Sequence, residues 1–401
     1  MAILTLIAAL LLGVTFGTFT GIIPGIHINL VAALLLASIN HLQGISSLAL
    51  AVFITSISIT HIFLDFIPSI LLGAPEEDTA LAVLPGHEML KEGKGYEAIV
   101  LSVSGALSAL PIILIVWPIF ILFLPSIFPI FKDVIPFSLI FLSLYLIFRE
   151  REFIVSLVVF ILASFLGLIS FNLPIQEPLL PMLTGLFGIS SLFISLKSKT
   201  IIKPQKIAPL KEIYFTKKDL FKSFVASFIV APLCSFLPGI GSNHAAALSS
   251  EIIPQGNRGF LFLIGSINTI IMSLSFVTIY AIGKARSGAA AAVEEILKEI
   301  SLQNIYILLI SIVLTACISF FISINLAKLS TLFINRLNYQ KLTFSIIIFL
   351  FFINFLLTNW IGLIVLITSC YIGIFCILSN VRRINLMGAL IVPAVVYYLI
   401  N

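Results

Sequence analysis

Two short segments of this 401-residue chain carry residue types that could bind an anion. Pro24 and Gly25 open the first segment, and Pro238 and Gly239 open the second. Proline has no N–H to donate and glycine lets the chain turn, so each Pro-Gly pair is expected to interrupt a helix. A helix that restarts after such a break presents unpaired N–H groups and a positive dipole end, which attract negative charge. The sequence therefore predicts two backbone sites for an anionic group.

Polar side chains that follow both breaks could shape such a site. Asn29 and Asn243 stand at equivalent positions after the two prolines. Asparagine in apolar surroundings is costly unless it is hydrogen-bonded, so each is expected to tie the broken helix together or to face substrate. His27 and His244 stand at non-equivalent positions and could contact an anion as imidazolium or act as capping groups. The predicted substrate site comprises Pro24, Gly25, His27, Asn29, Pro238, Gly239, Asn243 and His244.

The two segments belong to a longer duplication. Residues 20–34 read TGIIPGIHINLVAAL and residues 234–248 read CSFLPGIGSNHAAAL. Duplicated hydrophobic segments with Pro/Gly interruptions are typical of secondary transporters, in which broken helices meet the substrate near the membrane midplane. A simple kink is the alternative for either Pro-Gly pair, but the repeated motif favours a shared site. We expect a first transmembrane repeat at 1–196, a lysine-rich linker at 197–222 and a second repeat at 223–401.

Composition places these repeats in a membrane. Hydrophobic residues make up 60% of the chain and charged residues only 10%, and the mean hydropathy is +1.21. Since soluble domains usually have about a quarter charged residues, soluble enzymes, disordered chains and nucleic-acid-binding proteins are excluded. One span takes about 20 apolar residues, which leaves room for roughly 9–11 hydrophobic segments. The predicted fold class is an all-α polytopic membrane protein, built from two inverted repeats with Pro-Gly-broken helices or re-entrant hairpins.

Basic residues are concentrated in a few loops, which predicts the orientation. Lysines are densest in the linker at 197–222, so the positive-inside rule places this linker in the cytoplasm. An even number of predicted segments separates successive basic loops: 96–124 and 134–148 lie between Lys94 and Arg149, and 342–358 and 361–379 lie near the C-terminus. We therefore expect a multi-pass protein of the cell membrane in which the basic loops share one side. These loops contain Lys91, Lys94, Arg149, Arg151, Lys328, Lys341, Arg382 and Arg383.

One carboxylate lies inside an otherwise apolar stretch. Asp65 follows His61 by one helical turn, so both side chains would lie on the same helix face. Ionisable groups within a membrane span are costly and are usually functional. We predict that Asp65 carries a coupling proton or sodium ion with His61 as its partner. The alternative is a helix end in the headgroup region.

An acidic turn follows the same stretch. Glu76, Glu77 and Asp78 could coordinate a cation or gate a cavity, although three adjacent carboxylates are also common in a solvated turn. Lys284 and Arg286 stand at the corresponding place in the second half, where they could pair with this turn or form a separate solvated loop.

Other features favour packing roles over catalysis. Gly13, Gly17, Gly21 and Gly25 recur at every fourth position and predict a smooth helix face for close packing. The chain has no nucleotide-binding, zinc-protease, hydrolase or CxxC motif. We therefore expect no catalytic residue, no metal site and no cofactor. An integral membrane enzyme acting on lipid is the alternative outside transport.

Three blocks of sequence resemble a known family. They are GTFTGIIPGIHINLVAALLL at 17–36, LGAPEEDTALAVLPGHEMLKEGKGYEA at 72–98 and SFLPGIGSNHAAAL at 235–248. They are similar to the signatures of the TctA family, the large permease subunit of tripartite tricarboxylate transporters, and most like its stand-alone archaeal branch. The resemblance implies an ion-driven secondary transporter of citrate-like carboxylates. It also implies a small membrane subunit and an extracytoplasmic binding protein as partners. The acidic Glu76, Glu77 and Asp78 depart from the small, neutral residues of bacterial relatives.

These observations together predict a permease for a small organic anion, driven by a proton or sodium gradient. A permease that recycles a polyprenyl phosphate is the alternative, because the helix-terminus argument applies equally to carboxylates and phosphates. The expected partners are a small anionic substrate or an anionic lipid, and the surrounding membrane lipids. No nucleic acid is expected, and the sequence leaves a homo-oligomer open.

Overall fold

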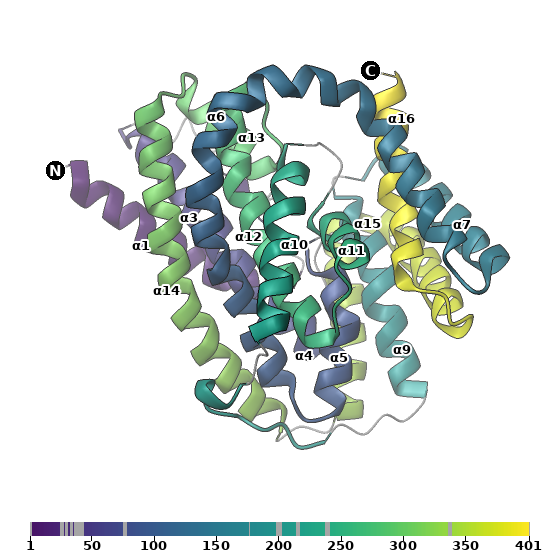
Figure 1. Cartoon of the computed structure of the whole chain (residues 1–401). Coiled ribbons are helices and arrows are strands. Elements are labelled where there is room, and N and C mark those ends of the chain that lie inside the picture. Colours follow the sequence, from purple (N-terminus) through teal and green to yellow (C-terminus); the bar gives the residue numbers. More distant parts are fainter. Residues whose placement is uncertain are drawn as a thin grey trace.

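The computed structural model in Figure 1 is a bundle of helices, most of which run in roughly the same direction. It describes residues 2–24, 28, 31–32, 35, 44–74, 78–175, 177–197, 203–213, 217–236, 241–335 and 339–400. Every regular element among these residues is a helix. This architecture confirms the predicted all-α class.

The first part of the chain forms α1 (Ala2–Ile22), α3 (Ser47–Leu64), α4 (Phe66–Leu72), the 3-10 turn η2 (Ala80–Ala82), α5 (Val83–Lys91), α6 (Gly95–Phe148), α7 (Phe153–Asn172), α8 (Leu179–Leu183), the π-helical turn η3 (Thr184–Ile189) and α9 (Ser190–Lys197). The second part forms η4 (Leu210–Glu212), α10 (Lys217–Ser235), α11 (Ser242–Ile252), α12 (Asn257–Ile282), α13 (Gly288–Leu297), α14 (Leu302–Ile334), α15 (Tyr339–Leu378), η5 (Arg383–Met387) and α16 (Gly388–Ile400).

Nine helical stretches among the described residues are long and apolar enough to cross a membrane. Large apolar side chains such as Phe141, Phe321 and Trp360 are exposed on the outside of the bundle. Such a surface suits lipid, because a protein in water rarely exposes large apolar patches. The chain is therefore a multi-pass membrane protein.

Two long helices differ from simple spans. Asn359 has a φ of 55° inside α15, so this element is two helices joined at a break, as the segments 342–358 and 361–379 predicted. Leu350 and Leu366, on either side of the break, belong to one small core cluster with Leu192 of α9. By contrast, α6 continues through five internal prolines, where the sequence suggested two separate segments. It bends and crosses the end of the bundle in Figure 1, since proline kinks a helix without always ending it.

The helices form two groups. The first group contains α1, α3, α4, α5, α10, α11, α12, α13, α14 and the start of α6. In it, α12 is packed along α6, and both α1 and α14 are packed along α3. The second group contains α7, α8, η3, α9, α15, η5 and α16. Each group therefore combines helices from both halves of the sequence.

Glycines allow the closest helix contacts of the first group. A Cβ on Gly105 of α6 would meet the carbonyl of Phe262, and a Cβ on Gly265 of α12 would meet the carbonyl of Ser102. On α1, Gly13, Gly17 and Gly21 lie against the backbone and side chains of α3. The predicted packing face of α1 is thus confirmed for these glycines, while Gly25 lies outside the described residues.

Hydroxyl groups join α3 to α14 across a buried face. The Oγ1 of Thr315 donates to the Oγ of Ser56 at 3.1 Å, the Oγ of Ser319 to the Oγ1 of Thr60 at 2.9 Å, and the Oγ of Ser323 to the carbonyl of Phe63 at 3.1 Å. Interhelical hydrogen bonds of this kind hold membrane helices together where apolar packing has no hydrophobic driving force. They fix α14, from the second half, against α3, from the first.

The basic loops meet at one end of the bundle. The side chain of Gln205 in the linker accepts from the N–H of Gly95 and donates to the carbonyl of Leu90, both at 2.8 Å. Its backbone N–H donates to the Oδ1 of Asn335 at 2.7 Å, at the end of α14. The linker, the α5–α6 turn and the α14–α15 loop therefore share one side, as predicted. The cytoplasmic location of that side stays a prediction.

Candidate substrate site

A polar junction joins the two halves of the chain beside α11. The N–H of Leu81 donates to the Oδ1 of Asn243 at 3.1 Å, and the Oγ of Ser242 donates to the Oδ1 of Asp78 at 2.7 Å. Asn268 of α12 adds a bond from its Nδ2 to the carbonyl of Asp78 at 3.1 Å. Ser242, Asn243 and Asn268 are each about 1% exposed. We call these five residues the α11 junction.

The α11 junction lies well inside the protein. It contacts η2, from which α5 runs nine residues to the basic turn before α6. A helix of that length spans about 13 Å. The loop at 78–81 is also attached to α4, because the Oγ of Ser69 and the Oγ1 of Thr79 are hydrogen-bonded at 2.7 Å. The first turn of α11 therefore contacts a loop that hydrogen bonds to α4 and α12 hold in place.

His244 caps α11. Its Nδ1 accepts a hydrogen bond from the N–H of Gly241 at 3.0 Å, which satisfies one donor of the helix start. A ring nitrogen that accepts cannot carry a proton, so this imidazole is neutral and has its proton on Nε2. Of the two roles that the sequence left open for His244, the structure shows the cap. The Nε2 is buried and makes no hydrogen bond within the described chain, so it can donate to a ligand.

His61 and Asp65 occupy the interior of the first group. They are 2% and 1% exposed, respectively. The Nδ1 of His61 is hydrogen-bonded to the Oγ1 of Thr20 on α1 at 3.1 Å, and α4 begins directly after Asp65. Asp65 is therefore at a joint within one long apolar stretch, Ser47–Leu72, and not at an exposed helix end. A buried carboxylate at such a joint is consistent with an ion-binding role.

Several predicted site residues lie outside the described part of the chain. They are Gly25, His27, Asn29, Pro238, Gly239, and the acidic Glu76 and Glu77. Pro24 is described and buried just after α1. The direct approach of the two Pro-Gly segments to each other thus stays a prediction. Among the described residues, Ser242 and Asn243 at the start of α11 are hydrogen-bonded to the loop at 78–81.

Two cavities lie between the two helix groups, near the basic loops. The larger, about 400 Å³, is bounded by η2, α5 and α11 on one side and by Phe187 and η5 on the other. The smaller, about 340 Å³, is bounded by α5, α9 and the chain at 377–383. None of His61, Asp65, Asn243 and His244 lines either of these two cavities.

Charged residues around the larger cavity were missed as site residues by the sequence analysis. Glu251 at the end of α11 pairs with Arg149 and, at 2.7 Å, with Arg382. Arg382 also pairs with Glu150 at 2.5 Å. The sequence indicated only basic loops on one side, because the carboxylates that neutralise them are distant in the chain. In the described residues, no group of three or more His, Cys, Asp and Glu side chains is placed to hold a metal ion.

The predicted pairing of Lys284 or Arg286 with the acidic turn stays a prediction, because Glu76 and Glu77 lie outside the described residues. Lys284 lies over the ring of Phe128, 5.2 Å from its centroid, and the one described carboxylate of the turn, Asp78, bonds to Ser242. The contact that Asp78 makes is therefore with the start of α11.

Replacing Asn243 by alanine is expected to destabilise the protein by about 1–3 kcal/mol, because the partly buried N–H of Leu81 loses its acceptor. The same change should reduce substrate uptake. Thermal unfolding of the detergent-solubilised protein measures the first effect. Asn325 is a matched control, since its exposed side chain bonds only to its own helix, so Asn325→Ala should stay within about 0.5 kcal/mol of the parent. Equal stability of the two variants would contradict the role of Asn243.

Comparisons with known proteins give one family and one similar archaeal protein. Residues 7–388 match the Tripartite tricarboxylate transporter TctA family. The chain is 32% identical over 403 residues to Uncharacterized protein MJ1079 of Methanocaldococcus jannaschii, covering 97% of this chain and 98% of that protein. No solved structure matches the chain.

Proposed function

The chain belongs to the TctA family of tripartite tricarboxylate transporters, and from this premise we propose that it is a secondary active transporter of a small organic anion. The substrate is a carboxylate, and a proton or sodium gradient drives its movement. This proposal retains the function predicted from the sequence and gives it a location, the α11 junction.

The observation that carries the proposal is the buried meeting of two interrupted segments from different halves of the chain. Leu81 and Asn243 are joined directly, and the loop before Leu81 is held by Ser242 and Asn268. The nine residues of α5 separate the junction from the basic turn and span about 13 Å, which is close to half of a hydrocarbon core of about 30 Å. Transporters place their substrate at such a depth, where backbone breaks are sheltered from lipid. The segments at Pro24–Asn29 and Pro238–Gly239 would complete the site.

Asp78 gives this site a gate. Its carboxylate is bonded to Ser242, the first residue of α11, where the helix dipole favours negative charge. A substrate carboxylate that approaches the same helix start is repelled while Asp78 remains charged and in place. Substrate binding therefore requires Asp78 to move away or to take up a cation. Uptake of a cation by Asp78 would link anion binding to the driving ion, with Asp65 and His61 as the second ion-binding pair.

Alternating access would occur between the two helix groups. Both described cavities lie at their boundary, so a rocking motion there would open or close a path from the basic side. In each half of the chain, the earlier helices belong to the first group and the later ones to the second. These are α1, α3 and the start of α6, then α7 and α9, in the first half, and α10, α12 and α14, then α15 and α16, in the second. This order supports two related repeats, as transporters of this type have.

Uptake of labelled citrate into proteoliposomes that contain only this chain tests the proposal. Separate proton and sodium gradients identify the driving ion, and a panel of mono-, di- and tricarboxylates identifies the substrate. Gradient-dependent uptake by the chain alone would also show that accessory subunits are dispensable. Transport of a polyprenyl phosphate with no carboxylate uptake would replace the substrate class, and no gradient-dependent movement of either would refute the transporter.

A further inference from the structure

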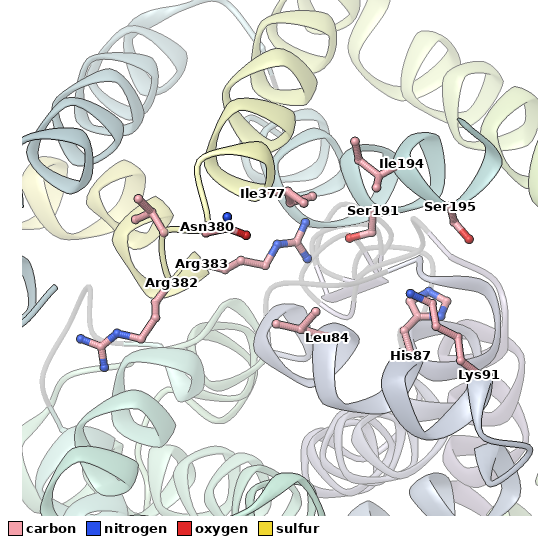
Figure 2. A pocket seen from close by; sticks show the side chains of 11 residues that line it. Leu84, His87, Lys91, Ser191, Ile194, Ser195, Ile377, Asn380, Arg382 and Arg383 are labelled. Atoms are coloured by element: carbon pink, nitrogen blue, oxygen red, sulfur yellow. The ribbon is translucent and has the colours of Figure 1, made fainter. Parts of the chain in front are cut away.

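The smaller cavity has an unusual charge balance. Figure 2 shows the side chains that line it, contributed by α5, α9 and the end of α15 with the start of η5. Lys91, Arg382 and Arg383 are basic, and none of the 11 lining residues is acidic. We call this space the basic cavity. Its volume of about 340 Å³ is at the lower end of the range for small-molecule sites.

Arg383 is the central cation. Its side chain is directed toward Ser191 in Figure 2, and the residue is only 8% exposed. One terminal nitrogen donates to the Oγ of Ser190 at 2.9 Å, and the guanidinium lies over the ring of Phe187. The Nε and the other terminal nitrogen make no hydrogen bond within the described chain. A buried cation with unused donors is costly, and an anion that accepts from them would offset that cost.

The neighbouring Arg382 serves a different purpose. In Figure 2 it points away from Arg383, and it is neutralised by Glu150 and Glu251. The excess positive charge of the basic cavity therefore comes from Arg383 and from Lys91 across the space.

His87 adds a second buried polar group. It is 7% exposed, and neither ring nitrogen makes a hydrogen bond within the described chain. Burial and the charges of Lys91 and Arg383 lower the pKa of His87 to about 4, so the ring is neutral at pH 7. A neutral imidazole offers one donor and one acceptor to a ligand. The ring is positioned from behind by Gly73, where any Cβ would meet the Nε2.

We infer that the basic cavity binds a small multivalent oxyanion, a di- or tricarboxylate or a phosphate, between Arg383, Lys91 and His87. A planar guanidinium suits both carboxylate and phosphate oxygens, whereas Lys91 supplies a second charge at the open side. The basic cavity shares no residue with the α11 junction and lies nearer to the basic loops. It is therefore distinct from the α11 junction, and it adjoins the larger cavity, with which it shares Leu84, Arg382 and Arg383.

This binding does not depend on transport. An anion held at the basic cavity would neutralise Arg383. It would also bridge α5 of the first helix group to α9 and η5 of the second. Such a bridge would favour the arrangement seen here over one in which the two groups separate. A failure of gradient-driven uptake would leave the binding intact, and a failure of binding would leave the transport proposal standing.

Calorimetric titration of the purified full chain with citrate, inorganic phosphate and acetate tests the inference. Citrate and phosphate are expected to bind, and acetate to bind at least about tenfold more weakly, because it has a single charge. Lys91→Gln should weaken citrate binding about fivefold, in keeping with a partly screened charge. Lys94→Gln is the matched control, since Lys94 is close in the chain but outside the cavity and pairs with Glu92, and it should change binding less than twofold.

Arg383→Gln should weaken citrate binding by at least about thirtyfold, and Arg383→Lys should recover part of it. Gel filtration shows whether each variant is folded, and the exposed Lys91 keeps the test valid if Arg383 variants are not. Citrate and phosphate affinities that are unchanged in Lys91→Gln would overturn the inference, as would a wild-type chain that binds neither anion at millimolar concentration. If a polyprenyl phosphate competes with citrate, and Lys91→Gln weakens both, the source of the oxyanion is the lipid headgroup.

Discussion

Replacing Asp65 by asparagine is expected to abolish gradient-driven accumulation of substrate while leaving substrate exchange across the membrane. Asparagine keeps the size and hydrogen-bonding capacity of the side chain but cannot bind a proton or neutralise a sodium ion. Asp65 is buried within a long apolar stretch, where a carboxylate is costly and is kept for a function. Loss of the Asp65 charge should therefore uncouple substrate movement from the ion gradient but leave the substrate pathway open.

The expected effect is large because each coupled charge contributes strongly. One elementary charge moving through a potential of about 100 mV supplies about 2.3 kcal/mol, which corresponds to a roughly fiftyfold concentration ratio. Asp65→Asn should lower the accumulated substrate by about that factor. Proteoliposome uptake with an imposed gradient measures accumulation, and counterflow without a gradient measures exchange in the same preparation.

Asp219→Asn is the matched control. Asp219 is an exposed carboxylate in the first turn of α10, so its loss should leave both accumulation and exchange unchanged. Wild-type accumulation by Asp65→Asn would exclude Asp65 from coupling. If exchange disappears as well, Asp65 contributes to the path or to folding, and the coupling role is again not supported.

Replacing Gly105 by alanine is expected to destabilise the protein by at least about 3 kcal/mol, the upper range for overpacking a core. A Cβ at this position would meet the carbonyl oxygen of Phe262, which is backbone and cannot turn aside. The two helices would have to move apart, although the reciprocal contact at Gly265 holds them together. Gly105→Leu should prevent folding. Thermal unfolding of the solubilised protein, followed by gel filtration, measures both variants.

Gly256 provides the control for this prediction. It precedes α12 with an extended backbone, and a Cβ there would meet nothing within 4 Å. Gly256 is the N-cap of α12, where alanine is less favourable than glycine, so Gly256→Ala should cost no more than about 1 kcal/mol. A Gly105→Ala protein as stable as Gly256→Ala would show that α6 and α12 are not packed as closely as described.

Several features of the fold followed from local pattern. The scarcity of charge predicted membrane-spanning helices, because lipid excludes an unpaired charge wherever it stands in the chain. The spacing of Gly13, Gly17 and Gly21 predicted the packing face of α1, since helical geometry alone places such residues in one row. The parity of the hydrophobic segments predicted that the basic loops share one side. The three sequence blocks identified the TctA family, which the comparison over residues 7–388 shows.

The candidate sites could be predicted only in part. The importance of Asn243 and His244 was visible in the repeated motif, but their partners were not. Asp78 and Leu81 contact the start of α11 because of how α4, α5 and α12 pack together. Local sequence patterns do not predict such contacts between residues that are far apart in the chain. Arg383 was predicted only as one of several loop charges, although its neighbours Arg382 and Lys91 differ greatly from it in burial and pairing.

The sequence by itself determined the class and the family, because hydrophobicity and short motifs act within a few residues of the chain. It did not determine every helix break, since α6 continues through its five internal prolines. The tertiary structure alone decided which broken segment meets which loop and which cation remains without a carboxylate. Those outcomes depend on side chains that are far apart in the chain. Burial then raises the cost of every unmatched polar group among them and so selects one arrangement.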